Sequence, residues 1–348
     1  MIKKTLPLLL LAALAAVILG ATASAQNTAT FKAAFVTDTN GLNDKSFNHL
    51  GNVGRLRAQK QLKIGTKVFV STTEADYLPN AVAAAQQYGA GAVVMNGFLL
   101  STATDTAAKQ FPKVKWAITD FPRVALEKNP ADVPSNAYGL TFKSEQSGYL
   151  VGYLAAEMVK AKIGWAGKLK GKKLVVGAVG GKKIPSVDNW IAGYRAGVRA
   201  FDKRFTVLID YSGDFVNSTA PKCKELALKH ISQGSQAEFA VAGGCGLGAL
   251  QGARSSKVWG IGVDADQHYL GSHILTSGVK RVDTAVFNFY SLAKAGKLGP
   301  GHDIVFNLKN KGQDVGIISK KAPKAFITKM NAKKALIIKG KIKPPSTL

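Results

Sequence analysis

One polar loop, Thr37 to Asn48, carries the residue types best suited to chemistry in this sequence. It reads Thr-Asp-Thr-Asn-Gly-Leu-Asn-Asp-Lys-Ser-Phe-Asn and lies between a short apolar segment and a helical pattern. In an open parallel sheet, loops of this kind lie at the carboxyl ends of the strands, where ligands bind. The carboxylates, amides and single aromatic ring suit a neutral ligand that has hydroxyl groups and a ring. No nucleophile stands beside a base here, so the loop predicts binding.

Patterns typical of an enzyme are weak in the rest of the chain. The sequence has no H-E-x-x-H motif, no P-loop and no Cys/His cluster. Several carboxylates fall near predicted strand ends, namely Asp38, Asp44, Asp120, Asp264 and Asp266. Paired acids can cleave glycosides, but carboxylates at strand ends also bind hydroxyl groups without any reaction. We favour the second interpretation and expect neither catalysis nor a metal nor a cofactor.

Dinucleotide binding is the sharpest competing hypothesis. Gly244-Cys-Gly-Leu-Gly248 follows a predicted strand and opens a helix, and Asp264 lies 20 residues after Gly244. This arrangement is similar to the Rossmann fingerprint with its acidic ribose ligand. Counted from Gly246, however, Gln251 occupies the position that needs a small residue, so we rank this hypothesis below reversible binding.

Four side chains could hold a nucleoside-like ligand, although each also has an ordinary structural interpretation. Phe47, in the first helical turn, could stack on a base, which is worth about 1–3 kcal/mol, or belong to the core. Asn48 offers both a donor and an acceptor. Asp264 could accept from two hydroxyls or cap the next helix. Lys280 could donate to a ring nitrogen or carbonyl, or face solvent.

The elements that must position these residues alternate between strand and helix, which predicts an α/β fold with parallel sheets. Strands are expected at residues 31–36, 67–70, 92–95, 115–118, 136–140, 173–179, 206–211, 239–242 and 259–263. Helical patterns separate them and continue at residues 279–295 and 322–338. The first set of elements is complete near residue 140, and the second begins with a helix at 144–160.

The chain begins with a pattern typical of a secretory signal peptide. Lys3 and Lys4 precede an apolar run, and an A-x-A cleavage pattern ends at Ala25. We therefore expect cleavage near Ala25 and export to the periplasm, without lipid attachment, since no cysteine lies near this site. The remaining length exceeds the usual size of a single core and predicts two domains.

The formal net charge of +26 is high, and the lysines are scattered with a modest cluster at residues 160–173. No nucleic-acid-binding module accompanies them, so we expect no nucleic-acid partner and a solvated basic surface. The two cysteines, Cys223 and Cys245, could meet at one sheet edge as a disulfide. The pattern leaves two separate thiols as the slightly favoured alternative.

A series of motifs resembles the basic membrane protein (Bmp) family, which comprises substrate-binding proteins of ABC transporters whose characterised members bind purine nucleosides. The resemblance begins with Val36 to Asn48 and continues in the family's order over nearly the whole mature chain. The further motifs are Gly97-Phe-Leu99, Ile118-Thr-Asp120, residues 142–152, Gly177-Ala-Val-Gly-Gly181, Ile184-Pro-Ser-Val187, Gly193-Tyr-Arg-Ala-Gly197, residues 242–248, 261–267, 275–283 and 337–344.

The resemblance implies a type I periplasmic-binding fold, with two Rossmann-like lobes of parallel sheets joined by a hinge. The first lobe would comprise residues 26–140, completed by about 266–295, and the second 141–265, completed by about 296–348. A purine nucleoside (guanosine, inosine or adenosine) would be clamped between them. The ligand contacts implied are Asp38, Phe47, Asn48, Asp120, Gly244, Asp264 and Lys280, with Trp190 as a weaker candidate for a stacking face.

The same resemblance implies a monomer that delivers its ligand to an ABC transporter permease. A sugar-binding or sensory protein on this fold remains the alternative. Cys245 departs from the family, because it stands where a small hydroxyl residue is common. This departure leaves open which nucleoside is bound.

Overall fold

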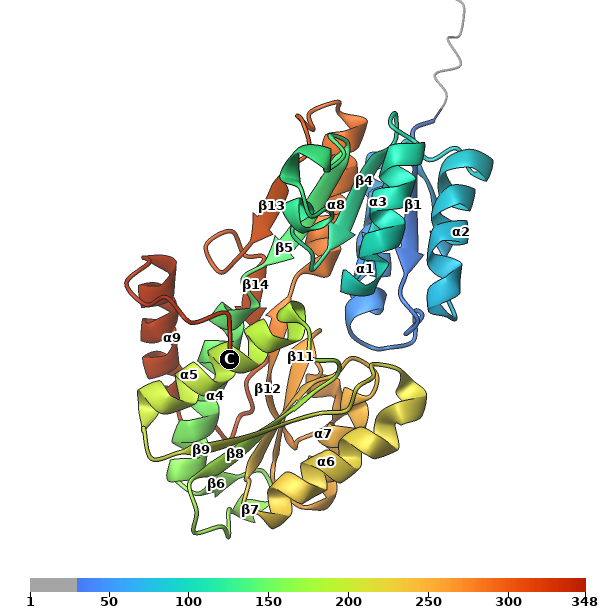
Figure 1. Ribbon diagram of the computed structural model, residues 1–348. Coiled ribbons are helices and arrows are strands. Elements are labelled where there is room, and N and C mark those ends of the chain that lie inside the picture. The colour runs from blue at the N-terminus through green and yellow to red at the C-terminus, as the bar shows by residue number, and fades with distance from the viewer. Residues whose placement is uncertain (1–29) are drawn as a thin grey trace, which may run out of the picture. The chain divides into compact units, whose positions relative to one another are not determined.

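The computed structural model describes residues 30–348, which contain two six-stranded sheets flanked by helices (Figure 1). The first sheet has the strand order β13-β5-β4-β3-β1-β2, and all its neighbouring strands are parallel. Its strands are β1 (Lys32–Thr37), β2 (Gly65–Phe69), β3 (Ala92–Asn96), β4 (Lys115–Thr119), β5 (Ala137–Phe142) and β13 (Asp303–Phe306).

The second sheet has the order β14-β12-β11-β10-β8-β9 and is parallel except at its β14 edge. Its strands are β8 (Val175–Gly180), β9 (Thr206–Tyr211), β10 (Ala237–Val241), β11 (Trp259–Asp264), β12 (Ile274–Lys280) and β14 (Gln313–Val315). A short hairpin of β6 (Ile163–Gly164) and β7 (Gly167–Lys168) precedes β8. The expected α/β fold with two parallel-sheet lobes is thus confirmed.

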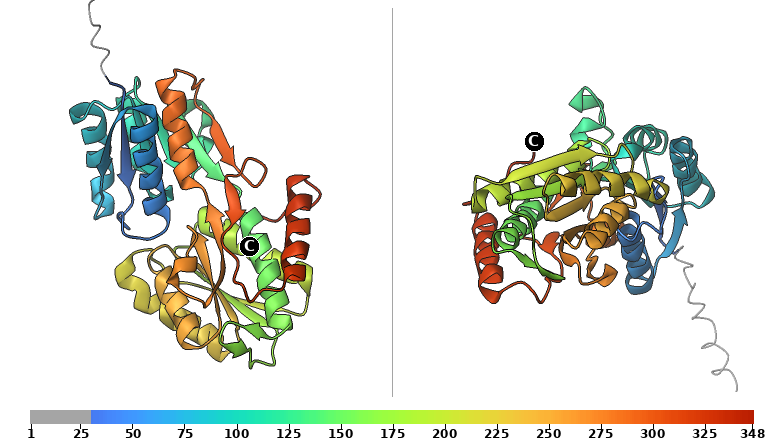
Figure 2. Two further views of the ribbon diagram at one scale, coloured as in Figure 1. Left: turned by 180° about the vertical axis from the view of Figure 1, so that it is seen from behind. Right: turned by 90° about the horizontal axis from the view of Figure 1, so that it is seen from below.

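Helices cover both faces of each sheet, which explains why every residue of the central strands β3 and β10 is buried rather than every second one (Figure 2). The first sheet is covered by α1 (Phe47–Leu62) and α8 (Val282–Lys294) on one face, and by α2 (Tyr77–Val82) and α3 (Ser101–Gln110) on the other. The second is covered by α4 (Ser144–Lys160), α5 (Pro185–Phe201) and α9 (Lys324–Ile338), and by α6 (Ala220–Ser232) and α7 (Gly246–Ser255).

Glycines let α4 and α5 pack backbone against backbone. A Cβ at Gly193 would collide with the backbone of Glu145, and one at Gly152 with the backbone of Tyr194. This close packing fixes the start of α5, whose first turns carry Ser186 and Trp190 toward the space between the sheets.

The chain crosses between the two sheets three times, after β5, after β12 and after β13. The structure corrects the sequence-based boundaries, which gave residues 266–295 to the first lobe and 296–348 to the second. Strand β12 pairs with β11 in the second sheet, whereas β13 extends the first sheet by pairing with β5. Strand β13 belongs to the first lobe because its side chains Ile304 and Phe306 pack into the core of that lobe.

Among residues 30–348, no helix is long and apolar enough to span a membrane. The predicted signal peptide and its cleavage site lie outside the described residues.

Candidate ligand-binding site

A pocket lies between the two sheets, at the carboxyl ends of their strands. The lining comes from loops after β1, β3 and β4 in the first lobe and after strands β8 to β12 in the second. Six predicted residues line it, namely Asp38, Phe47, Asp120, Trp190, Asp264 and Lys280.

Lys280 lines this pocket and is only 2% exposed. Its Nζ is 2.7 Å from Asp120 Oδ2 of the first lobe and 3.5 Å from Asp264 Oδ1 of the second. Burial opposes the charge, but the two carboxylates outweigh burial and raise the pKa of Lys280. The ammonium also lies 5.2 Å from the Phe47 ring centroid, so a protonated lysine joins both lobes beneath an aromatic face.

The two carboxylates that face Lys280 have the same unusual backbone. Asp120 follows β4 and Asp264 ends β11, and both have φ of 61° in the left-handed region. Non-glycine residues rarely adopt this conformation, and such strain gathers at functional sites. The matching strain in two separate lobes supports a functional role for this pair.

A chain of amides holds Asp38 in place. Asn48 Nδ2 donates to Asp38 Oδ1 at 2.6 Å, and Asn96 Nδ2 donates to Asn48 Oδ1 at 2.9 Å. Thr119 Oγ1 completes the chain by donating to Asn96 Oδ1. Asn48 is fully buried and does not line the pocket, so it lies one layer behind the position that the sequence analysis expected for it.

Two residues of the polar loop from Thr37 to Asn48 have roles that were not predicted from the sequence. Asp44 caps α1 by accepting from the backbone N–H groups of Ser46, Asn48 and His49 at 2.7–3.0 Å. The Oγ atom of Ser46 lies 3.0 Å from Asp264 Oδ2 and 3.1 Å from Val263 O. The loop therefore contacts the second lobe directly.

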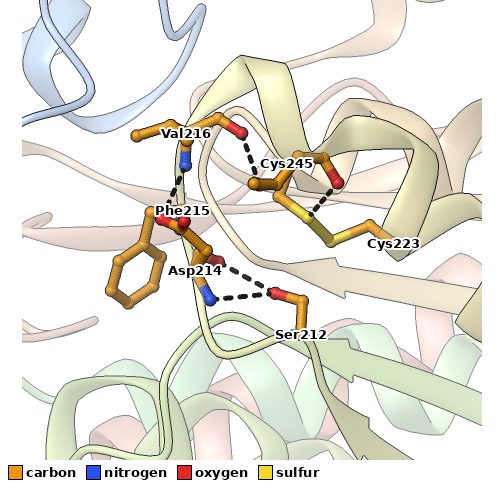
Figure 3. Close-up of a disulfide and its surroundings, with 7 residues drawn as sticks. Ser212, Asp214, Phe215, Val216, Cys223 and Cys245 are labelled. Atoms are coloured by element: carbon orange, nitrogen blue, oxygen red, sulfur yellow. Dashed lines mark hydrogen bonds between the residues drawn. A yellow bond between two sulfur atoms is a disulfide. The ribbon is translucent and has the colours of Figure 1, made fainter.

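A disulfide supports the second-lobe wall of the pocket (Figure 3). Cys223 and Cys245 are joined, with their Cα atoms 5.7 Å apart, so the expectation of two separate thiols is wrong. The backbone N–H of Cys245 donates to the carbonyl of Phe215 at 3.0 Å, and Asp214 Oδ1 accepts from the N–H of Phe215 at 2.7 Å. These bonds hold Phe215, which lines the pocket, on the loop after β9.

Phe215 was missed by the sequence analysis, although its place just after a strand was a usable signal. Gly244 lies beside the lining rather than in it, because Gly243 forms this part of the wall. A Cβ at Gly244 would collide with Asn217. Gly244 therefore serves close packing of two loops. No group of three or more metal-ligating side chains occurs within residues 30–348.

Solved structures share this two-lobe α/β fold. A solute-binding protein of an ABC transporter system from Aeropyrum pernix K1 matches with a TM-score of 0.77. It is 22% identical, and the match covers 90% of this chain and 94% of that one. A second such protein, from Conexibacter woesei, matches with a TM-score of 0.67 at 23% identity over 91% and 99% of the two chains.

The model of the Bmp family, described as ABC transporter substrate-binding protein PnrA-like, matches residues 31–347. The chain therefore belongs to the Bmp family of ABC transporter substrate-binding proteins, and the resemblance seen in its motifs is confirmed. It is 34% identical to the ABC transporter nucleoside-binding protein BmpA of Lactococcus lactis, over 90% of this chain and 89% of that one. It is also 31% identical to the CD4+ T-cell-stimulating antigen of Listeria monocytogenes, over 90% and 88%.

Proposed function

We propose that this protein captures a purine nucleoside in the periplasm and delivers it to the permease of an ABC importer, without catalysis and as a monomer. The observation that carries the proposal is the buried Lys280 between Asp120 and Asp264, next to the ring of Phe47 in the pocket lining. Carboxylates suit ribose hydroxyls, and the ring suits a base. The name of the Lactococcus lactis relative, a nucleoside-binding protein, supports the same ligand class.

The pocket suggests a role for each residue. Phe47 from the first lobe and Phe215 from the second supply stacking faces, and Trp190 contributes to the same lining. Asp264 accepts from ribose hydroxyls. Asp120 and Lys280 contact polar atoms of the ligand, while Asn48 acts through Asp38.

Capture requires the lobes to close, and the three crossings form the hinge. The Lys280–Asp120 ion pair and the Ser46–Asp264 contact join the lobes in this structure, so closure and ligand contact use the same side chains. A sensory protein would close in the same way. Neighbouring genes for a permease and an ATPase favour import, whereas a receptor gene favours sensing.

Removing the Phe47 ring is expected to weaken guanosine binding by about 5- to 150-fold, corresponding to about 1–3 kcal/mol of stacking. The melting temperature of the ligand-free protein should fall no further than that of Phe287→Ala, because both rings are half-buried and pack against the first-lobe core. Calorimetric titration and thermal unfolding of Phe47→Ala measure the two quantities separately.

The matched control is Phe287→Ala, which removes a half-buried ring on α8 that packs on the first-lobe core. It should leave guanosine affinity unchanged. If Phe47→Ala instead destabilises the ligand-free protein strongly and keeps its affinity, Phe47 is a core residue and the proposed stacking is wrong.

Nucleoside binding is expected to release protons near pH 6. Burial raises the pKa of Asp38 to about 6, despite hydrogen bonds from Asn48 and Asn40 that lower it. A ligand donor to Asp38 favours its ionised form, so affinity should fall by up to about tenfold per unit as the pH falls below 6. Titrations at pH 5–8 in two buffers of different ionisation heat measure the released protons, and Asp38→Asn should abolish them.

A sugar-binding protein is the second candidate function on this fold. A thermal-shift panel separates the two, because a ligand at 100 times its dissociation constant stabilises the folded state by about 2.7 kcal/mol. We expect guanosine, inosine or adenosine to raise the melting temperature, and ribose or glucose at the same concentration to leave it unchanged. A shift with the sugars alone would favour the second candidate.

A further inference from the structure

The positive charge of this protein is concentrated in the second lobe. Residues 143–281 and 307–348 contain 31 lysines and arginines against 11 acidic residues, a formal charge of +20. Residues 31–142 and 282–306, which belong mainly to the first lobe, contain 14 against 10, a formal charge of +4. A basic composition that served only solubility would not need this asymmetry.

Seven of these 31 cations lie at the end of the second sheet that is opposite the ligand pocket. Parallel strands begin at one edge of a sheet, so segments that lead into β8, β9 and β11 come together there. The β6–β7 hairpin lies at the same end (Figure 1). We call this group the distal basic surface, and it comprises Lys162, Lys168, Lys170, Lys172, Lys173, Lys203 and Lys257.

The side chains of the distal basic surface are available to a partner. All seven lysines are exposed, and none of them forms an ion pair with another described residue. Lys168, Lys170 and Lys257 also line a hollow between the hairpin and the turn that precedes β10. Seven cations without an ion-pair partner, three of them lining a hollow, attract an anionic partner.

The position and residue type indicate which anionic partner fits. A permease that receives the ligand has to face the pocket between the lobes, whereas the distal basic surface belongs to one lobe and lies at its far end. Its seven cations are lysines, which act as mobile hydrated point charges, and Arg254 at the end of α7 adds an exposed guanidinium beside them. Such a surface suits a flat partner with evenly spread negative charge better than an acidic protein whose carboxylates have fixed positions.

We propose that the distal basic surface binds the anionic phospholipid headgroups of a membrane. Clusters of four to eight lysines are attracted to anionic bilayers over about a Debye length. The contact leaves the ligand pocket uncovered and holds the protein near the membrane in both its loaded and its empty state. It is independent of the ligand and of the closure of the lobes.

The test is co-sedimentation of the purified protein with vesicles of phosphatidylcholine alone or with one third phosphatidylglycerol. We expect binding only to the anionic vesicles at low salt, and at least a tenfold loss of partitioning at 0.5 M NaCl. The triple variant Lys168→Glu, Lys170→Glu, Lys172→Glu should reduce partitioning at least tenfold. Soluble glycerol phosphate at millimolar concentration should not displace the protein, because a single headgroup cannot replace an array.

The matched control carries the same change in net charge on the first lobe, as Lys60→Glu, Lys113→Glu, Lys128→Glu at three exposed positions. It should lower partitioning less than threefold. Equal losses in the two triple variants would show that net charge alone acts, and would overturn the proposal. Absence of binding to anionic vesicles would overturn the proposal too. So would a result in which the Lys168, Lys170 and Lys172 triple variant keeps its binding to anionic vesicles but binds less well to a permease in neutral nanodiscs.

Discussion

Replacing Lys280 by methionine is expected to abolish measurable nucleoside binding and to lower the free energy of unfolding by about 3–5 kcal/mol. The side chain is 2% exposed, and its loss leaves Asp120 and Asp264 as facing carboxylates without a cation. Breaking a buried ion pair by removing one partner has a cost of this size, because the remaining charge is uncompensated. Calorimetric titration with guanosine and urea unfolding of the ligand-free variant measure the two effects.

The pH dependence of the variant separates this explanation from a simple loss of packing. Burial already raises the pKa of Asp120, and Lys280 opposes that rise, so without Lys280 the pKa of Asp120 rises further above the unfolded value of about 3.9 and the folded protein binds protons more tightly. The variant should therefore be least stable at pH 8 and recover as the pH falls toward 5. Adding Asp120→Asn should restore part of the stability at pH 8. A destabilisation that is independent of pH would contradict the explanation that Lys280 compensates the charges of Asp120 and Asp264.

Replacing His230 by alanine is expected to destabilise the protein by about 3–5 kcal/mol while leaving nucleoside affinity unchanged. This imidazole is 1% exposed, is not among the residues that line the pocket, and lies between Glu238 Oε2 and Asp210 Oδ2, each 3.0 Å away. Glu238 is fully buried on β10 and would be left without a partner. Removing one member of a buried ion pair is strongly destabilising, because the remaining charge is uncompensated. Urea unfolding at pH 7 measures the loss.

The cluster of His230, Glu238 and Asp210 should make the wild-type protein less stable as the pH rises above 6.5. Burial opposes protonation of His230, but Glu238 and Asp210 outweigh it and raise the pKa of the imidazole. A raised histidine pKa contributes stability that is complete below the unfolded value of about 6.5 and is lost as the pH rises through the folded value. His230→Ala should lack this decline. His302→Ala, at an exposed histidine, should change stability by less than about 0.5 kcal/mol.

The regular parts of the fold could be predicted because their apolar runs are short, buried on both faces and bounded by Gly, Asp and Asn. Strand β9 and helix α4 were predicted with the bounds that the structure has. Strand β12 was missed because Thr276, Ser277 and Gly278 interrupt its apolar pattern, although the first two are fully buried. Strand β13 was missed because only pairing with β5, more than 160 residues earlier, makes it a strand.

The site was predicted to the extent that its residues follow strands. Asp38, Asp120 and Asp264 all lie at strand ends, and the structure brings them to one pocket. The sequence could not show which polar side chains line the pocket and which lie behind them, because this depends on side-chain direction. Asn48 was therefore expected to contact the ligand directly. The disulfide could not be chosen from sequence either, because it depends on whether the start of α6 approaches the loop after β10.

The most direct test of the proposed function is calorimetric titration of the purified protein with whole nucleosides and with their separate halves. We predict that guanosine, inosine or adenosine binds one molecule per chain, with a negative heat-capacity change as the lobes bury the base. Ribose and free guanine should bind at least a hundredfold more weakly, because each engages only part of the pocket. Binding of ribose alone, or of no nucleoside in the panel, would contradict the account.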